Sequence, residues 1–247
     1  MSDAPRDRPD AWIRRLQPVA EPRLRVLFCP HAGASAETFS GLARGLAPGV
    51  EGLAVQYPGR RDRKAEPPLR DVRELAAASA AELGSVPAGP LVVVGHSMGA
   101  AVAFETARAL AQGGGASVRL VVSGRPAPSN GLGLAPPAGD DDIVAELRRT
   151  GAVPVKLLER PAYRESILSV LRSDFHANAT YRCSPNEQVP APITFLLSAE
   201  DPYVDKAKAE MWAAHTTAEF RLARFPGGHE FLFEHAEAVL QEIQAGL

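Results

Sequence analysis

Short apolar runs recur along the chain, and each is followed by glycine or proline and then by a stretch with helical spacing of apolar positions. Continuous apolar runs are typical of strands that are buried on both faces of a parallel sheet. Strands that alternate with helices predict an α/β fold, with a mainly parallel central sheet and helices on both faces. The predicted strands are Leu24–Cys29, Gly52–Gln56, Leu91–Val94, Val118–Ser123, Ile193–Leu197 and Phe220–Phe225. The predicted helices are Thr38–Leu46, Val72–Leu83, Ala100–Gln112, Lys206–His215 and Ala236–Ala245.

One long segment interrupts this alternation, between the strand that ends at Ser123 and the strand that begins at Ile193. It opens with a loop rich in glycine and proline, and two helical stretches follow, Asp141–Thr150 and Tyr163–Ala179. Crossovers in compact α/β domains are far shorter, and long connections are often functional lids. We therefore predict a helical lid at approximately residues 127–190, over the carboxyl edge of the sheet. The alternative is a structural elaboration without that role.

The third predicted strand leads directly into the sequence G-H-S-M-G at residues 95–99, and a helical stretch rich in alanine follows. A sharp turn between a strand and a helix is where many hydrolases hold a nucleophilic serine. Gly95 and Gly99 lack a Cβ atom, which allows the strand and the helix to approach closely. The sequence thus predicts that Ser97 is a nucleophile held above the sheet. An incidental glycine-rich turn is the alternative.

A serine hydroxyl attacks efficiently only when a base accepts its proton. In hydrolases with this turn, the chain order is serine, then acid, then histidine. Of the six histidines, His229 follows the last predicted strand, in the glycine-rich loop F-P-G-G-H-E-F at residues 225–231. His235 falls at the start of the terminal helix, and His96 is too close to Ser97 in sequence to be aimed at it. His229 is therefore the predicted base.

The acid is expected just past a strand that lies between the serine and the histidine. Asp201 follows the strand that ends at Leu197, where a carboxylate can orient the imidazole and stabilise the imidazolium. As alternatives, Asp201 could simply form the turn before Pro202, and Glu200 and Asp205 are competing acids, Asp205 also as a helix cap. The preceding strand ends without a carboxylate, which favours Asp201.

The tetrahedral intermediate of acyl transfer needs hydrogen-bond donors for its oxyanion. The first donor is expected to be the backbone N–H of Met98, directly after the nucleophile. The second is expected from the loop after the first predicted strand, where small residues allow the backbone to approach a substrate. We assign it to Ala32, with Gly33 as the alternative, and expect His31 to shape this loop and not to transfer protons.

Composition narrows the remaining possibilities. The chain has 247 residues and a formal net charge of −2, which fits one domain spanning residues 1–247 and gives no reason to expect nucleic acid or an anionic membrane as a partner. Its two cysteines, Cys29 and Cys183, are too few for a disulfide framework. No apolar run reaches the ~18 residues of a membrane span, and the polar start at Met1–Asp10 lacks the apolar core of a signal peptide. We expect a cytoplasmic protein.

Metal and cofactor chemistry finds no support in the motifs. The sequence contains no C-x-x-C, no H-E-x-x-H and no P-loop, so we expect neither a metal site nor a bound cofactor.

Several motifs together resemble one family. With Ser97, Asp201 and His229 in order, the chain resembles a type II thioesterase, the discrete editing hydrolase of polyketide and nonribosomal peptide synthases, in the α/β-hydrolase superfamily. Two departures stand out: Ala34 occupies a position that is commonly glycine, and Glu230 one that is often aromatic. The shared motifs are F-C-P-H-A-G-A at 28–34, Q-Y-P-G-R at 56–60, G-H-S-M-G-A at 95–100, A-F-E-T-A-R-A-L at 103–110, S-G-R-P-A-P at 123–128, R-S-D-F at 172–175 and F-P-G-G-H-E-F at 225–231.

The resemblance implies a substrate, a partner and a role. The substrate would be an acyl or aminoacyl group on the phosphopantetheine arm of a carrier protein, and the enzyme would release stalled or misprimed units by hydrolysis. Because the pantetheine belongs to the substrate, no cofactor is implied, and we expect a monomer. The alternatives are a carboxylesterase or lipase-like hydrolase of oxygen esters, an acyltransferase or cyclase, and a binding module without activity.

Two further expectations concern surfaces. Carrier proteins are typically acidic, so the basic run of Arg60, Arg61, Arg63 and Lys64 is a candidate docking site, unless it is a solvated loop or Arg60 is structural. The lid predicts an apolar chamber for the acyl chain. Its candidate lining or lid-core residues are Leu157, Leu158, Ile167, Leu171 and Phe175.

Overall fold

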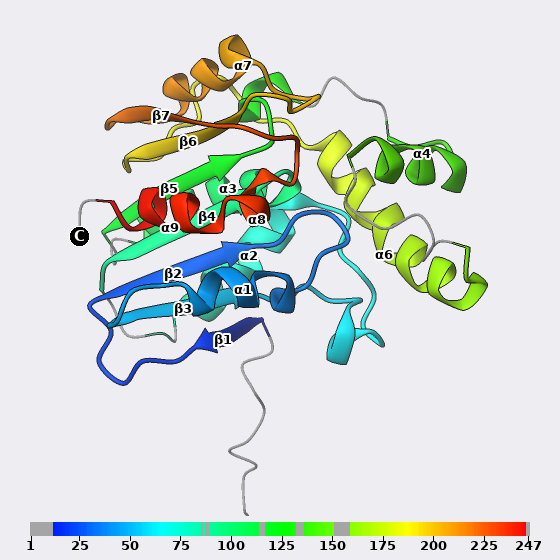
Figure 1. Cartoon of the computed structure of the whole chain (residues 1–247), viewed down its shortest axis with the longest axis horizontal. Helices are drawn as coiled ribbons and strands as arrows, with labels where there is room; N and C mark the ends of the chain where they lie inside the picture. Colours follow the sequence, from blue (N-terminus) through cyan, green and yellow to red (C-terminus); the bar gives the residue numbers. More distant parts are fainter. Residues whose placement is uncertain are drawn as a thin grey trace, which may run out of the picture.

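A seven-stranded sheet forms the centre of the molecule, in the strand order β1-β3-β2-β4-β5-β6-β7 (Figure 1). The structure, a computed structural model, describes residues 12–84, 86, 89–113, 117–131, 136–150 and 159–245. All neighbouring strands pair in parallel except β1 and β3, which are antiparallel. The strands are β1 (Ile13–Gln17), β2 (Leu24–Cys29), β3 (Val50–Val55), β4 (Leu91–His96), β5 (Val118–Ser123), β6 (Ile193–Ser198) and β7 (Phe220–Phe225).

The six strands predicted from apolar runs are all present, with small shifts at their ends. The edge strand β1 was not predicted, because its sequence I-R-R-L-Q contains two arginines and lacks a continuous apolar run. Only Ile13 of this strand is buried, and it belongs to the core, whereas Arg15 forms an ion pair with the buried Glu51 of β3. β1 is therefore a strand because it pairs with β3, and no pattern in its own sequence indicates that pairing.

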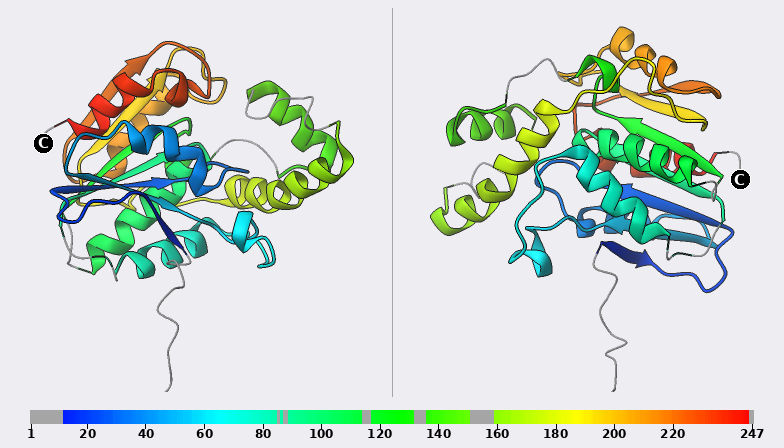
Figure 2. Two further views of the ribbon diagram at one scale, coloured as in Figure 1. Left: turned by 60° about the horizontal axis from the view of Figure 1, so that its bottom comes forward. Right: turned by 180° about the vertical axis from the view of Figure 1, so that it is seen from behind.

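Helices cover both faces of the sheet, as predicted. On one face, α2 (Val72–Leu83), α3 (Met98–Gln112), α7 (Lys206–Glu210) and the 3₁₀ turn η4 (Met211–His215) contribute to one apolar core. On the other, η1 (Ala36–Phe39), α1 (Ser40–Arg44), α8 (Phe231–Glu234) and α9 (Ala236–Gln244) contribute to a second core. Figure 2 shows the two helical layers on opposite sides of the strands. Two shorter 3₁₀ turns are η2 (Arg61–Arg63) and η3 (Pro128–Asn130).

Alternation along each strand builds these two cores. In β2, Val26 and Phe28 face one core while Leu27 and Cys29 face the other, since successive side chains of a strand point to opposite faces. Cys29 and Cys183 are buried free thiols. None of the helices that the structure describes has the length and apolar character that a membrane crossing requires.

Two predicted helices are each divided in two. The helix expected at Thr38–Leu46 is the pair η1 and α1, and the helix expected at Lys206–His215 is the pair α7 and η4. The terminal helix is preceded by the short α8, which the sequence analysis did not predict.

The described part of the long insertion contains the α-helices α4 (Asp140–Thr150) and α6 (Pro161–Thr180), close to the predicted ranges. They lie beyond the carboxyl ends of the parallel strands (Figures 1 and 2). A small apolar cluster joins them to each other and to Ala32 in the loop after β2. Its buried members are Ile143, Val144, Leu147, Leu168 and Leu171.

Candidate active site

Ser97 occupies a strained turn between β4 and α3. Its φ of 54° and ψ of −124° are rarely adopted by a residue with a side chain, and such strain is typical of functional sites. The turn depends on both flanking glycines: a Cβ on Gly95 would lie 2.2 Å from the Gly99 oxygen, and one on Gly99 would lie 2.0 Å from the Cys29 oxygen. The Ser97 N–H donates to the Ser123 oxygen of β5, at 2.9 Å. The predicted strand–turn–helix geometry is confirmed.

His229 and Asp201 form a buried pair at the same edge of the sheet. His229 Nδ1 lies 2.8 Å from Asp201 Oδ2, and the second carboxylate oxygen of Asp201 accepts the Tyr203 N–H at 2.9 Å. The two side chains are only 4% and 2% exposed. A hydrogen bond at Nδ1 directs the other ring nitrogen, Nε2, away from the carboxylate, which is the arrangement of a general base and its orienting acid.

The competing candidates lie in other environments. Asp205 caps α7 by accepting the Lys208 N–H at 2.8 Å, as its alternative role predicted. Glu200 is exposed, and His235 stands between α8 and α9. His96 is fully buried and its Nδ1 lies 2.8 Å from Ser123 Oγ, so this ring bonds the end of the neighbouring strand β5.

A cavity of about 360 Å³ brings Ser97 and His229 together beneath the insertion. Ala32 lines it on the side of the β2 loop, and Phe175 contributes from α6, as predicted. Tyr203 and Glu230 also line it, and sequence analysis did not single out Tyr203. The Tyr203 ring lies edge-on to His229, with 4.9 Å between ring centroids. Its position two residues after Asp201 was the only available signal.

Two N–H groups of the loop after β2 already have acceptors. Gly33 N–H donates to Asp174 Oδ2 of α6 at 2.7 Å, and Ala34 N–H donates to the His31 oxygen at 3.1 Å. No partner for the Ala32 N–H occurs among the described residues. Met98 begins α3, and the first N–H groups of a helix have no intrahelical acceptor. The geometry therefore favours Ala32 over Gly33 as the second oxyanion donor.

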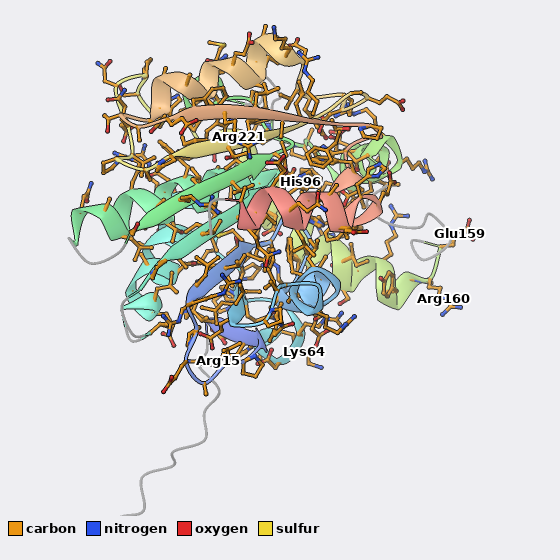
Figure 3. The ribbon with its side chains drawn as sticks, turned by 60° about the vertical axis from the view of Figure 1, so that its left-hand side comes forward. Arg15, Lys64, His96, Glu159, Arg160 and Arg221 are labelled. Atoms are coloured by element: carbon orange, nitrogen blue, oxygen red, sulfur yellow. The ribbon has the colours of Figure 1, made fainter. Side chains whose placement is uncertain are left out.

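Three histidine rings lie in contact around this centre. The ring centroids of His96 and His229 are 4.6 Å apart, and those of His31 and His96 are 5.9 Å apart. Burial and the neighbouring His229 lower the pKa of His31 to about 4, and burial holds the pKa of His96 well below its usual value. Figure 3 labels His96, which packs beside Phe231 of α8. Both rings are therefore neutral near pH 7. Burial raises the pKa of Glu230 above its usual value.

One group of described residues has the spacing of metal ligands. The ligand atoms of His96, His229 and Glu230 lie within 4.8 Å of one another. Asp201 already bonds one nitrogen of His229, so a metal ion here would take the nitrogen that a general base needs. The geometry of the His229–Asp201 pair fits a base better than a metal ligand.

The basic run predicted to face a partner is divided between interior and surface. Arg60 is buried and pairs with Asp174, and Arg63 is buried, bonding Glu66 and the Gln56 oxygen. These two residues are therefore not available for docking, and Arg60 has the structural role that was left open for it. Arg61 and Lys64 are exposed, and Figure 3 labels Lys64.

A second hollow of about 440 Å³ adjoins the cavity and shares His31, Ala32 and Leu147 with it. Arg61 and Lys64 line this hollow, and α6 contributes Ile167 and Leu171. The predicted lining residues that the structure describes are thus divided between two spaces. Phe175 lines the cavity that contains Ser97, whereas Ile167 and Leu171 line the second hollow. Leu157 and Leu158 lie outside the described residues.

Comparison with known proteins gives one consistent result. The family model of the thioesterase domain matches residues 25–247. The type II thioesterase BorB from the borrelidin biosynthetic cluster is 38% identical, with a TM-score of 0.86 and coverage of 96% of this chain and 98% of BorB. YbtT, a type II thioesterase from the yersiniabactin NRPS/PKS pathway, is 30% identical, with a TM-score of 0.86 and coverage of 94% and 96%.

A further relative is the "Probable cadicidin biosynthesis thioesterase" of Streptomyces griseus, 39% identical over 237 residues. The match covers 96% of this chain and 66% of that protein. Sequence and fold thus agree over nearly the whole chain: this is a thioesterase with the α/β-hydrolase fold. It belongs to the type II thioesterases, as its motifs indicated.

Proposed function

We propose that this protein is a serine thioesterase in which Ser97 is the nucleophile, His229 the general base and Asp201 the residue that orients the base. The observation that carries the proposal is the shared cavity, which places strained Ser97 and the paired His229 under the inserted helices. The chain order serine, acid, histidine is the order found in α/β-hydrolases.

The chemistry follows in two steps. Ser97 Oγ attacks the thioester carbonyl carbon while His229 Nε2 accepts the hydroxyl proton, and Asp201 stabilises the imidazolium that forms. The tetrahedral intermediate collapses, the carbon–sulfur bond breaks, and the thiolate leaves with the proton from His229. Water, deprotonated by His229, then attacks the carbonyl carbon of the acyl-enzyme. The ester bond to Ser97 breaks, Ser97 Oγ takes the proton from His229, and the free acid is released.

Two backbone amides would stabilise the oxyanion in both steps, those of Met98 and Ala32. The free N–H of Ala32 and the position of Met98 at the first residue of α3 support this assignment. Donors fixed in a site that excludes water are worth on the order of 10²–10³ in rate each.

The substrate we propose is an acyl group on the phosphopantetheine arm of a carrier protein, released as an editing step in polyketide or nonribosomal peptide biosynthesis. BorB and YbtT, which come from such clusters, support this class over an oxygen ester. The pantetheine arm belongs to the substrate, so the proposed reaction needs no cofactor. Lid helices α4 and α6 would enclose the acyl chain.

The deciding experiment compares turnover of an acyl-carrier, acyl-N-acetylcysteamine and a p-nitrophenyl ester. We expect free acid as the product and the highest kcat/KM with the acyl-carrier. A fluorophosphonate should label the wild type and not Ser97→Ala. Full hydrolysis by Ser97→Ala would refute the nucleophile, and a cyclic or transferred product would favour acyl transfer.

Carrier docking is proposed at Arg61 and Lys64 only, since these two remain exposed beside the hollow next to the cavity. Arg61→Glu and Lys64→Glu should lower kcat/KM for the acyl-carrier about 10-fold or more and leave acyl-N-acetylcysteamine unchanged. Arg44→Glu, at an exposed position of α1, is the control for net charge. An equal loss with both substrates would argue against docking.

A further inference from the structure

The carboxylate of Asp174 joins three parts of the molecule. It lies on α6, is 1% exposed, and its Oδ2 accepts both the Gly33 N–H and the Arg60 guanidinium. Gly33 stands next to Ala32, the second proposed oxyanion donor. We propose that Asp174 is a positioning residue that sets the oxyanion loop in its active conformation, an inference that rests on the proposed function.

The amide that Asp174 bonds is that of Gly33, directly after the proposed donor Ala32. By accepting the Gly33 N–H at 2.7 Å, Asp174 turns that group away from the substrate side. Gly33 has a φ of +78°, a conformation that glycine adopts without strain and that allows the chain to turn sharply at this residue. The hydrogen bond thus fixes the peptide orientation on one side of Ala32, whose own N–H has no partner among the described residues.

The Q-Y-P-G-R motif holds the same loop from its other side. Arg60 Nε donates to the Ala34 oxygen at 2.8 Å, and Gln56 Oε1 accepts the Ala36 N–H at 2.9 Å. The Tyr57 hydroxyl, also buried, donates to the Pro30 oxygen at 3.3 Å. Each polar side chain of this motif therefore bonds the oxyanion loop, which explains the motif without any contact to a partner protein.

Helix α6 is held in place by contacts on both sides of Asp174. Leu171, one turn before Asp174, packs so closely on Gly33 that a Cβ there would lie 2.8 Å from the leucine side chain. One turn after Asp174, Asn178 accepts from the buried Arg125 of the S-G-R-P-A-P motif. The two motif arginines thus anchor one face of α6, and α6 in turn holds Gly33. The position of this lid helix then determines the geometry of the oxyanion hole.

The alternative is that the buried Asp174–Arg60 ion pair only stabilises the fold. Two substitutions separate the two roles, because both remove the negative charge that pairs with Arg60. Asp174→Asn keeps an oxygen that can accept the Gly33 N–H, whereas Asp174→Leu has a similar shape and no acceptor. Glu165→Gln is the matched control, since it removes an exposed carboxylate of the same helix that pairs with Arg172.

We expect Asp174→Leu to lower kcat roughly 10- to 100-fold with KM within about 3-fold of the wild type, which is less than the loss of a whole oxyanion donor because the Ala32 amide is displaced and not removed. Asp174→Asn should keep most of kcat although it also lacks the charge that pairs with Arg60, and Glu165→Gln should match the wild type. Inhibition by an alkyl boronic acid, which forms a tetrahedral adduct on the serine, should weaken by the same factor as kcat. Hydrogen exchange of the Gly33 amide should be fast only in Asp174→Leu.

Equal kcat values for the two variants, or slow exchange of the Gly33 amide in Asp174→Leu, would overturn the inference in favour of a structural ion pair. If Asp174→Leu does not fold, Asp174→Ala replaces it with the same expected losses. The result is separable from the proposed function: activity retained by Ser97→Ala refutes the triad, whereas an inactive Ser97→Ala with a fully active Asp174→Leu refutes only the positioning role.

Discussion

At the scale of single residues, the site depends on glycine positions that leave no room for a side chain. Ser97 keeps its strained backbone because the surrounding contacts fix it: its N–H bonds β5, and the glycines on either side allow α3 to reach β2. The strain aims the hydroxyl into the cavity and is maintained by the packing of the sheet.

The Gly99→Ala substitution tests this packing. The new methyl would meet the Cys29 oxygen at 2.0 Å, a backbone atom that cannot move aside, so we expect a loss of about 3 kcal/mol or more in the free energy of unfolding. Gly41→Ala is the control: nothing lies within 4 Å of its added Cβ, and in helix α1 it should stabilise by up to about 1 kcal/mol. Urea unfolding of both variants measures the difference. Equal effects would contradict the packing account.

The buried histidines predict how stability depends on pH. His96 and His31 have lowered pKa values in the folded protein, so below about pH 6.5 the unfolded chain takes up protons that the folded chain does not. Their contribution to stability is therefore fully present above about pH 6.5 and is lost as the pH falls below that value, by up to about 1.4 kcal/mol per pH unit for each histidine. His96→Gln should reduce this slope by about one proton, measured by urea unfolding at several pH values. His176→Gln is the control, and an unchanged slope in His96→Gln would refute the assignment.

At the scale of elements, charge pairs decide what apolar patterns leave open. β1 joins the sheet through backbone pairing with β3 and through Arg15, which reaches Glu51. Glu51 is fully buried and also bonds Arg25 of β2 at 2.9 Å, so one carboxylate connects three adjacent strands. Buried arginines also hold α6: Arg60 forms an ion pair with Asp174, and Arg125 donates to the amide oxygen of Asn178.

Glu51→Leu should destabilise the protein by about 3–5 kcal/mol, because it leaves the buried Arg25 without this carboxylate. The double variant Arg25→Met, Glu51→Leu should regain most of that loss, since an apolar pair can replace a buried ion pair at little cost. Thermal unfolding of the two variants gives the comparison. A double variant as unstable as the single one would show that the charges are not the cause.

At the scale of the whole molecule, stability is unevenly distributed. The sheet is packed on both faces by large apolar cores, whereas α4 is joined to α6 by the small cluster around Leu147 and Leu171. Regions with few buried apolar contacts open locally at lower free energy than the core. We therefore expect α4 and α6, the proposed lid, to move when a substrate binds.

Hydrogen exchange tests this distribution. Amides of α4 should exchange through local opening, at a free energy well below that of global unfolding, and amides of the buried helix α3 only on global unfolding. Native-state exchange at low denaturant concentrations separates the two classes by their denaturant dependence. The same exchange free energy in both helices would contradict a lid that opens independently.

Local patterns in the sequence, namely strand runs, helix spacing and the glycine turn, predicted the class of fold, the two helices of the insertion and the order of Ser97, Asp201 and His229. They also offered Ala32 as the second oxyanion donor, with Gly33 left open. The folded chain favours Ala32, because the bond from Gly33 to Asp174 joins residues 141 positions apart. The same holds for β1, for buried Arg60 and Arg63, and for Tyr203 beside His229. Their roles depend on partners that meet only when the sheet and lid assemble, and no local pattern records such partners.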